Sequence, residues 1–285
     1  MKLTKPEADL YVPDGRPASD ALALTTHLAI GAHQDDLEFM ALHGILECFR
    51  RPDRSFAGVT MTNGAGSARS GPYAACSNDE MVQIRVAEQR EAALIGGYGC
   101  QIQLMYSSSE LKNASNPGPV NDLLEILSLA RPQVVYLHNP ADKHDTHVAS
   151  CLRALAALRR LEPAARPSRV LGCEVWRNLD WLLDEDKQVM PVDDRPNLAA
   201  ALSGVFDSQI SGGKRYDLAV QGRRLANATF FESHEVDRHT QLAFAMDLTP
   251  LVADSSLDVA AYTTSLVDRM RDDVAGRLAR MSRGV

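Results

Sequence analysis

The sequence predicts an α/β fold: a Rossmann-like, mostly parallel sheet with helices on both faces, followed by an irregular C-terminal elaboration. Two observations lead to this expectation. Short apolar runs alternate with stretches of helical periodicity between about residues 27 and 176, which is the pattern of strands joined by crossover helices. Polar, proton-active side chains directly follow two of those runs, at the carboxyl ends of the expected strands, where open sheets of this kind bind ligands.

Each element of this fold has its own segment of the chain. The expected strands lie at 28–32, 56–61, 102–105, 134–138 and 170–176. The expected helices lie at 36–50, 79–96, 120–130 and 146–160, and an amphipathic helix at 257–280 closes the chain. The Gly-rich and Ser-rich segment 62–78 follows the second strand and is expected to form a flexible wall of a ligand cleft.

The domain boundaries follow from the same periodicity. Residues 1–26 contain three prolines and lack a sustained pattern, so we expect an N-terminal arm that packs over the domain. Residues 27–285 are expected to form a single α/β domain. Its core lies at about 27–176, and its C-terminal elaboration lies at about 177–285, where prolines and glycines interrupt the pattern.

The overall composition argues against several classes of function. The net charge of −7 and the lack of any basic run argue against nucleic acid or an anionic membrane surface as a partner. No apolar stretch has the length of a membrane span and the N-terminus lacks a signal-peptide core, so a cytoplasmic location is expected. The five scattered cysteines favour reduced thiols over disulfides or a thiolate zinc site. The oligomeric state stays open, a homo-oligomer included.

Two polar clusters carry the chemistry. The first contains His33 and Asp36, and the second contains His144 and His147. In each cluster the two side chains lie three residues apart where a helix begins, so they can reach one point. Imidazole and carboxylate groups are ligands of catalytic zinc, which takes three protein ligands and keeps one position open. One such motif is ordinarily a helix cap beside a core histidine, but two at strand ends predict a shared metal site. His138, at the end of an apolar run, fits either the core or the site.

The residues of both clusters resemble the motifs of a known family. The run Ala-His-Gln-Asp-Asp-Leu-Glu at 32–38 resembles the Ala-His-Pro-Asp-Asp-x-Glu signature of the PIG-L/LmbE-like family of zinc-dependent N-acetylglucosaminyl deacetylases. The run His-Asp-Thr-His at 144–147 is similar to the second motif of that family, His-Pro-Asp-His, and Arg85 and Glu88 match its Arg-x-x-Glu helix. The resemblance covers about residues 27–176 and implies that 27–285 is one deacetylase-like domain.

The resemblance implies a role for each residue of the two clusters. His33, Asp36 and His147 would bind one divalent metal ion, zinc, and Asp35 would be the general base. His144 would stabilise the oxyanion of the tetrahedral intermediate as a cation. These roles agree with simple chemistry, because zinc lowers the pKa of its bound water to about 7 and a carboxylate beside it can take the proton as the water attacks an amide.

One further match and two departures from the family pattern affect the site. Arg85 would contact hydroxyl groups of the sugar. Gln34 stands where the family has proline, which alters backbone stiffness rather than metal ligation. Thr146 stands where relatives have the aspartate that orients the catalytic histidine, so either Asp142 or Asp145 supports that histidine instead, or the properties of His144 are tuned differently.

The implied function is that of a metal-dependent hydrolase that removes an acetyl group from an N-acetylated amino sugar or its conjugate, a small-molecule substrate. One alternative is a metal amidohydrolase acting on another N-acyl group, and a second is a catalytically degenerate metal-binding member of the family. A nucleotide-binding module is disfavoured, because no Gly-x-Gly-x-x-Gly motif follows the first strand. A site of two histidines and one aspartate also accepts iron, cobalt or manganese.

Overall fold

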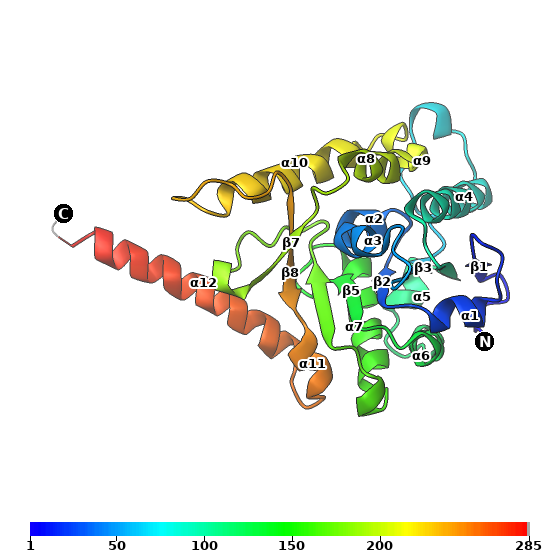
Figure 1. Cartoon of the computed structure of the whole chain (residues 1–285), viewed down its shortest axis with the longest axis horizontal. Coiled ribbons are helices and arrows are strands. Elements are labelled where there is room, and N and C mark those ends of the chain that lie inside the picture. The colour runs from blue at the N-terminus through cyan, green and yellow to red at the C-terminus, as the bar shows by residue number, and fades with distance from the viewer. Residues whose placement is uncertain (284–285) are drawn as a thin grey trace.

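The computed structural model of the chain describes residues 1–283 and contains an eight-stranded sheet with helices on both faces (Figure 1). The strand order is β1-β4-β3-β2-β5-β6-β8-β7. The strands are β1 Asp9–Tyr11, β2 His27–Gly31, β3 Phe56–Thr62, β4 Cys100–Tyr106, β5 Val134–His138, β6 Arg169–Cys173, β7 Lys187–Pro191 and β8 Leu242–Asp247. The strands from β4 to β6 are mutually parallel, β1 is antiparallel to β4, and β8 is antiparallel to β6 and β7. The predicted α/β fold class with a mostly parallel sheet is confirmed.

Helices cover both faces of this sheet, and alternate strand residues point into two separate core clusters. In β2, Leu28 and Ile30 belong to the cluster that contains side chains of α1, α6, α7 and α11, whereas Ala29 belongs to the cluster with α2, α3, α4 and α8. The helices are α1 Ala18–Ala23, α2 Asp36–Met40, α3 Leu42–Cys48, α4 Asn78–Gly96, α5 Ser108–Lys112, α6 Gly118–Ala130, α7 Asp145–Arg159, α8 Pro196–Gly204, α9 Asp207–Ile210, α10 Tyr216–Phe230, α11 Thr249–Ala253 and α12 Val259–Met281. Because both faces are covered, β2 and β3 are buried along their whole length.

The first 26 residues contribute more than a covering arm. The strand β1 extends the sheet by pairing with β4, and Leu22 of α1 is fully buried in the first core cluster. Thr4 donates hydrogen bonds to Asp122 of α6 from its amide, at 2.9 Å, and from its hydroxyl, at 2.7 Å. The sequence did not indicate these contacts, because the segment is short and its prolines break any periodic pattern.

The helix expected at 36–50 is divided into α2 and α3. Ala41 separates them, and its backbone is not helical, with φ −111° and ψ 19°. The buried guanidinium of Arg224 donates hydrogen bonds at 2.9 Å and 3.0 Å to the carbonyls of Glu38 and Phe39. In a continuous helix these carbonyls would accept from amides four residues later. A distant arginine therefore replaces the bonds that the break removes.

The C-terminal part is more regular than the sequence indicated. The strands β7 and β8 extend the sheet beyond β6, although β7 ends in Pro191 and three helices separate the two strands in sequence. The strand expected at 170–176 ends earlier, at Cys173. The last helix, α12, leaves the body near β7, and its C-terminal end projects away from the sheet (Figure 1). None of the helices in residues 1–283 is both long and apolar enough to cross a lipid bilayer.

The order of the strands places a switch point between β2 and β5. The strands β3 and β4 lie on one side of β2, whereas β5 and β6 lie on the other, and β2 is parallel to both of its neighbours. The loops that leave the carboxyl ends of β2 and β5 therefore diverge to opposite faces of the sheet and leave a crevice between them. Both predicted polar clusters lie in these loops.

Candidate functional site

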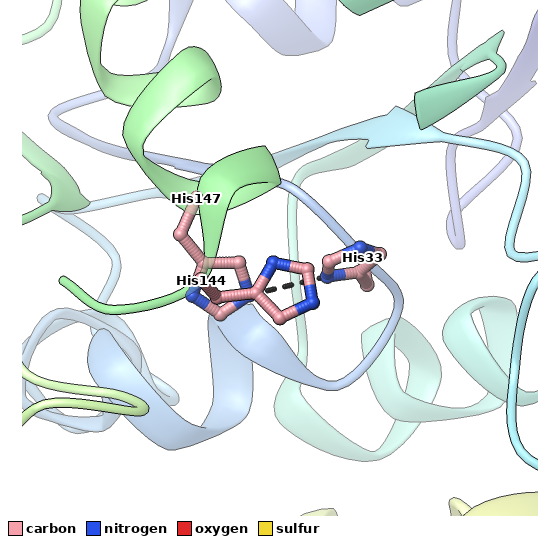
Figure 2. A group of neighbouring side chains, drawn as sticks. All are labelled: His33, His144 and His147. Carbon is pink, nitrogen blue, oxygen red and sulfur yellow. Dashed lines mark hydrogen bonds between the residues drawn. The ribbon is translucent and has the colours of Figure 1, made fainter. Parts of the chain in front are cut away.

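The loops after β2 and β5 bring the predicted metal-binding residues together. His33 and Asp36 follow β2, and His144 and His147 lie where α7 begins, with the three imidazoles gathered in one place (Figure 2). His33 Nδ1 is 3.2 Å from His147 Nε2 and 3.3 Å from Asp36 Oδ2. His147 Nε2 is 3.4 Å from Asp36 Oδ1. These three side chains thus present their donor atoms to one point.

Asp36 is buried and held in place by its own loop. The backbone amide of His33 donates a hydrogen bond at 2.7 Å to Asp36 Oδ2. Burial acts to raise the pKa of this carboxyl, but the imidazoles of His147 and His138 outweigh it and hold the pKa well below its usual range. The side chain is therefore an ionised carboxylate in a buried setting, which is the form that coordinates a metal ion.

His138 belongs to the site, although the sequence left it between core and site. Its ring is fully buried and stacks on the ring of His147, with centroids 3.9 Å apart. Its Nε2 is 3.2 Å from Asp36 Oδ2 and accepts a hydrogen bond at 2.9 Å from the amide of Ala32. Because the Ala32 amide already uses the lone pair of this nitrogen, His33 is better placed than His138 to complete the metal site. The sequence signal for this role of His138 was its position at the end of a strand, next to the second polar cluster.

Asp142, one of the two carboxylates expected to support His144, bonds to the backbone of that residue and faces the ring of His147. Asp142 accepts a hydrogen bond at 2.9 Å from the backbone amide of His144 and one at 3.1 Å from the amide of Trp176. Its Oδ2 lies 3.5 Å from Nδ1 of His147. Asp142 thus fixes the loop and faces the ring of His147, as an outer partner of a metal-binding histidine does.

No carboxylate in residues 1–283 bonds to the imidazole of His144, and the expected support is corrected accordingly. His144 Nδ1 has no hydrogen-bond partner within that range, and Asp145 is exposed on the first turn of α7. Burial, followed by the nearby His33, lowers the pKa of His144. The ring lies at the edge of the cavity, 5.0 Å from the ring of His33 between centroids. This setting favours a neutral imidazole over the expected imidazolium.

Asp35 occupies a strained position directly before α2. Its φ of 92° lies in the left-handed region that favours glycine. Gln89 Oε1 accepts a hydrogen bond at 3.2 Å from the Asp35 amide, and Arg85 Nη2 donates one at 3.0 Å to Asp35 Oδ2. Burial raises the pKa of Asp35 to about 6, although Arg85 opposes the shift. A carboxyl poised near neutral pH in a cavity wall is suited to proton transfer.

Arg85 lies beneath Asp35 as its ion-pair partner. Its side chain is only 1% exposed, and its guanidinium also contacts Glu88 at 3.5 Å on the next turn of α4. Glu88 in turn accepts hydrogen bonds at 2.7 Å from the amide and the hydroxyl of Ser208. The structure brings Arg85 to the cavity wall, where its contact with sugar hydroxyls stays a prediction.

The residue that replaces the family proline links three segments of the sheet edge. Gln34 is fully buried, and its Nε2 donates hydrogen bonds to the carbonyl of Thr62 at 3.1 Å and to Gln103 Oε1 at 3.0 Å. Gly64 packs against it with a φ of 73°, and a Cβ atom there would lie 2.6 Å from Gln34 Oε1. Glycine is therefore required where the Gly-rich loop passes the loop that follows β2.

A cavity of about 660 Å³ opens above these residues. Its floor contains His33, Asp35, Asp36 and His144, and one wall is the Gly-rich segment from Asn63 to Ala68, in the loop predicted to line a cleft. A second wall carries two aromatic rings from distant segments, Trp176 and Tyr216, which meet edge to face at 6.1 Å. The volume suits a small-molecule ligand.

The donor set fits a tetrahedral divalent ion. Donor atoms about 2.1 Å from one tetrahedral metal lie roughly 3.4 Å apart from one another. In the predicted set, His33 Nδ1 and His147 Nε2 lie 3.2 Å apart, and each approaches a different oxygen of Asp36, at 3.3 Å (Oδ2) and 3.4 Å (Oδ1) respectively. His33 and Asp36 also line the cavity, so a fourth position would face a ligand. His33, His144 and His147 form another group with mutually close nitrogens, as do Asp36, His138 and His147 with their donor atoms.

A family model agrees with the motifs and the geometry. The model of the PIG-L family, described as GlcNAc-PI de-N-acetylase, matches residues 28–158, a segment that contains both clusters. Residues 28–158 of this chain are thus similar to the PIG-L family. No curated protein matches the sequence at a significant level.

Solved structures share the fold of this chain. The N,N'-diacetylchitobiose deacetylase of Pyrococcus horikoshii is 15% identical, with a TM-score of 0.58 over 77% of this chain and 83% of its own. GalB, the 4-carboxy-2-hydroxymuconate hydratase of Pseudomonas putida, is 14% identical, with a TM-score of 0.57 over 79% and 96%. The zinc-inhibited form of teicoplanin deacetylase Orf2 is 15% identical, with a TM-score of 0.55 over 78% and 97%. At these identities the likeness concerns the fold, which supports both deacetylases and a hydratase.

Proposed function

We propose that this protein is a zinc-dependent hydrolase that removes the acetyl group from an N-acetylated amino sugar or its conjugate. One observation carries the proposal: the donor atoms of His33, Asp36 and His147 converge beside Asp35 at the floor of an open cavity. A set of three protein ligands with one position toward the ligand is typical of catalytic rather than structural zinc. The PIG-L match and the deacetylases among the similar folds support the same reaction.

His33, Asp36 and His147 would hold the zinc ion, which when bound polarises the substrate carbonyl and lowers the pKa of water at the open position. Asp142 would keep the ring of His147 oriented, since its carboxylate lies 3.5 Å from His147 Nδ1. His138 would support the ring of His147 by stacking on one of its faces.

Asp35 would take a proton from the attacking water and return it to the departing amine. Its carboxylate lines the cavity and is aimed by Arg85, which bonds to Oδ2 at 3.0 Å. His144 lines the same cavity from the other loop and would donate a hydrogen bond to the oxyanion. A neutral imidazole can donate this hydrogen bond through its ring N–H, so the role does not need a full positive charge.

The aromatic wall supports a sugar as the substrate. Trp176 and Tyr216 present apolar ring surface to the cavity, and sugar rings pack well on such surfaces. The ammonium groups of Lys143 and Lys214 lie 5.8 Å and 5.3 Å from the centre of the Trp176 ring. These cations favour a conjugate that carries an anionic group next to the sugar.

The experiment that tests this function measures acetate release by the zinc-loaded protein. The panel contains N-acetylglucosamine, its neutral and phosphorylated conjugates, their N-propionyl analogues, and N-acetyl amino acids. We expect release from N-acetyl sugars and none from the same sugars with His147→Ala. Release from N-acetyl amino acids alone would instead support the broader amidohydrolase, and no turnover of any amide would support a degenerate member of the family.

A further inference from the structure

Within residues 1–283, no other segment buries the second half of the last helix, α12. Its first half packs on the body through Tyr262 and Leu266, and Arg269 forms ion pairs with Glu185 and Asp186. Beyond that point the helix runs on to Met281 and extends away from the body (Figure 1). No side chain from 267 to 283 is buried. A lone helix of this length, with Gly276 in its middle, is marginal in water.

The exposed half carries a continuous apolar stripe. Its members are Val267, Met270, Val274, Leu278 and Met281, which are 44%, 37%, 42%, 65% and 77% exposed. At about 100° per residue, these five side chains fall within an arc of roughly 80° on the helix surface. The spacing of three and four residues is that of a helix that packs against another helix.

The stripe is symmetric about Val274. Val267 and Met281 lie seven residues before and after it, and Met270 and Leu278 lie four residues before and after it. A two-fold axis through Val274 of two antiparallel copies would therefore place Val274 opposite itself and Met270 opposite Leu278. Such self-complementarity is what an isologous dimer interface requires.

The charges along α12 favour the same antiparallel arrangement. The segment 268–273 contains three aspartates and two arginines, one of which is Arg269, already paired with the body. The charged residues of the segment 274–283 are all cationic: Arg277, Arg280 and Arg283. An antiparallel pair places this basic half along the acidic half of its partner, whereas a parallel pair would place the two basic halves together.

We propose that the protein forms a homodimer through antiparallel packing of two α12 helices about Val274. The partner is a second copy of this chain, chosen by the symmetry of the stripe and by the opposite charge of its two halves. This interface is independent of the reaction at the cavity. Because the stripe contains only five apolar side chains, the interface is small and the dimer should dissociate on dilution.

The first test is sedimentation equilibrium of the full chain across a range of concentrations. We expect a concentration-dependent dimer, and we expect Val274→Asp to raise its dissociation constant tenfold or more, because two carboxylates would then face each other at the axis. Ala279→Asp adds the same charge to the opposite side of α12 and should leave the dissociation constant unchanged. A monomer at all concentrations, or equal weakening by both variants, would overturn the proposal.

The second test determines the orientation by disulfide trapping. Of the five cysteines only Cys76 is not buried, so the variants are made in a Cys76→Ser background, which itself serves as the control. In an antiparallel pair Val274→Cys should form a cross-linked dimer under mild oxidation, and Met281→Cys should not. Cross-linking of both variants would show a parallel pair and refute the antiparallel interface.

A third measurement separates self-association from a membrane role of the same stripe. A helix with basic residues beside apolar ones can also lie on anionic lipid. The wild-type protein should co-sediment with vesicles containing one third phosphatidylserine no more than the Val274→Asp variant does. Binding to vesicles that depends on Val274, together with a monomer in solution, would assign the stripe to a lipid surface and overturn the dimer.

Discussion

The backbone of Asp35 has a φ of 92°. A residue with a Cβ atom adopts this conformation at a cost of about 1–3 kcal/mol. The Asp35 amide and carboxylate are each held by a buried side chain of α4, Gln89 and Arg85. Such strain persists where the surrounding structure fixes it, and here the side chain of Asp35 lines the cavity and does not cap α2.

We predict that Asp35 and Asp36 have separable roles. Asp35→Asn should keep the metal and lose about a hundredfold or more in turnover, because an amide cannot take the proton of the attacking water. Asp36→Asn should lose the metal, because it removes the ionised carboxylate from the donor set. Metal content by elemental analysis and acetate release on the same samples check both variants. Metal loss in Asp35→Asn, or near-normal turnover, would contradict the distinction.

A second prediction concerns His27, a buried histidine of β2 outside the site. Burial, followed by His43 and Arg54, lowers its pKa from 6.5 to about 4. The unfolded chain therefore takes up a proton below about pH 6.5, whereas the folded protein takes it up only near pH 4. The free energy of unfolding should fall as the pH is lowered across this window, by at most about 1.4 kcal/mol per pH unit. Above about pH 6.5 the contribution of His27 to this free energy does not change with pH.

The check for His27 compares urea unfolding at neutral pH and at about pH 5. The hydroxyl oxygen of Thr26 lies 2.9 Å from His27 Nδ1, and His27→Asn keeps a polar atom near it. This variant should lose less stability than the wild type on acidification. His234→Asn changes an exposed histidine and should behave like the wild type. Equal acid sensitivity of wild type and His27→Asn would show that other groups cause the loss.

At the scale of elements, α4 supports the loop after β2 that contains Asp35. Gln89 is fully buried in α4 and bridges two parts of the α2 region: it accepts from the Asp35 amide and donates at 2.9 Å to Glu38 Oε1. Tyr98 donates to the same oxygen at 2.6 Å. Burial raises the pKa of Glu38 to about 8, so this carboxyl serves structure rather than metal binding.

We predict that Gln89→Leu lowers kcat about tenfold or more while the metal content and the KM of the substrate stay near their wild-type values. The substitution fills the same space but releases the Asp35 amide, so the base is misaligned without any loss of a metal ligand. Glu91→Leu, which changes an exposed residue of the same helix, is the matched control and should leave kcat unchanged. A Gln89→Leu variant with normal kcat would show that the strained loop does not need this bond.

The sequence predicted the parts of the site that have a local pattern. His33, Asp36 and His147 could be found because each is part of a short motif at a strand end, and the alternation of elements placed those ends together. The roles of Gln89 and Arg224 could not be found in this way, because each acts on a segment more than fifty residues away through one side chain. The pairing of β7 with β8 was hidden for the same reason, since strand pairs separated by several helices have no local signature.

At the scale of the whole molecule, the candidate site joins segments that are far apart in the chain. The contact between His33 and His147 spans 114 residues and connects the loops after β2 and β5, the two central strands of the sheet. Asp142 extends the link to β6 by accepting from the amide of Trp176. An ion bound at this point would therefore tie together both halves of the parallel sheet, and its binding free energy would add to the stability of the whole fold.

We accordingly predict that zinc stabilises the chelator-treated protein against thermal unfolding. At a free zinc concentration about a thousand times the dissociation constant the gain is about 4.1 kcal/mol, which raises the Tm by roughly 8–16 °C for a domain of this size. His147→Ala should lose most of this zinc-dependent shift, even if its own Tm without zinc is lower, because the comparison is made within each variant. His234→Ala, which removes an exposed histidine outside the site, should keep the full shift. A shift of equal size in His147→Ala would place the bound ion elsewhere in the protein and remove the support for the proposed ligand set.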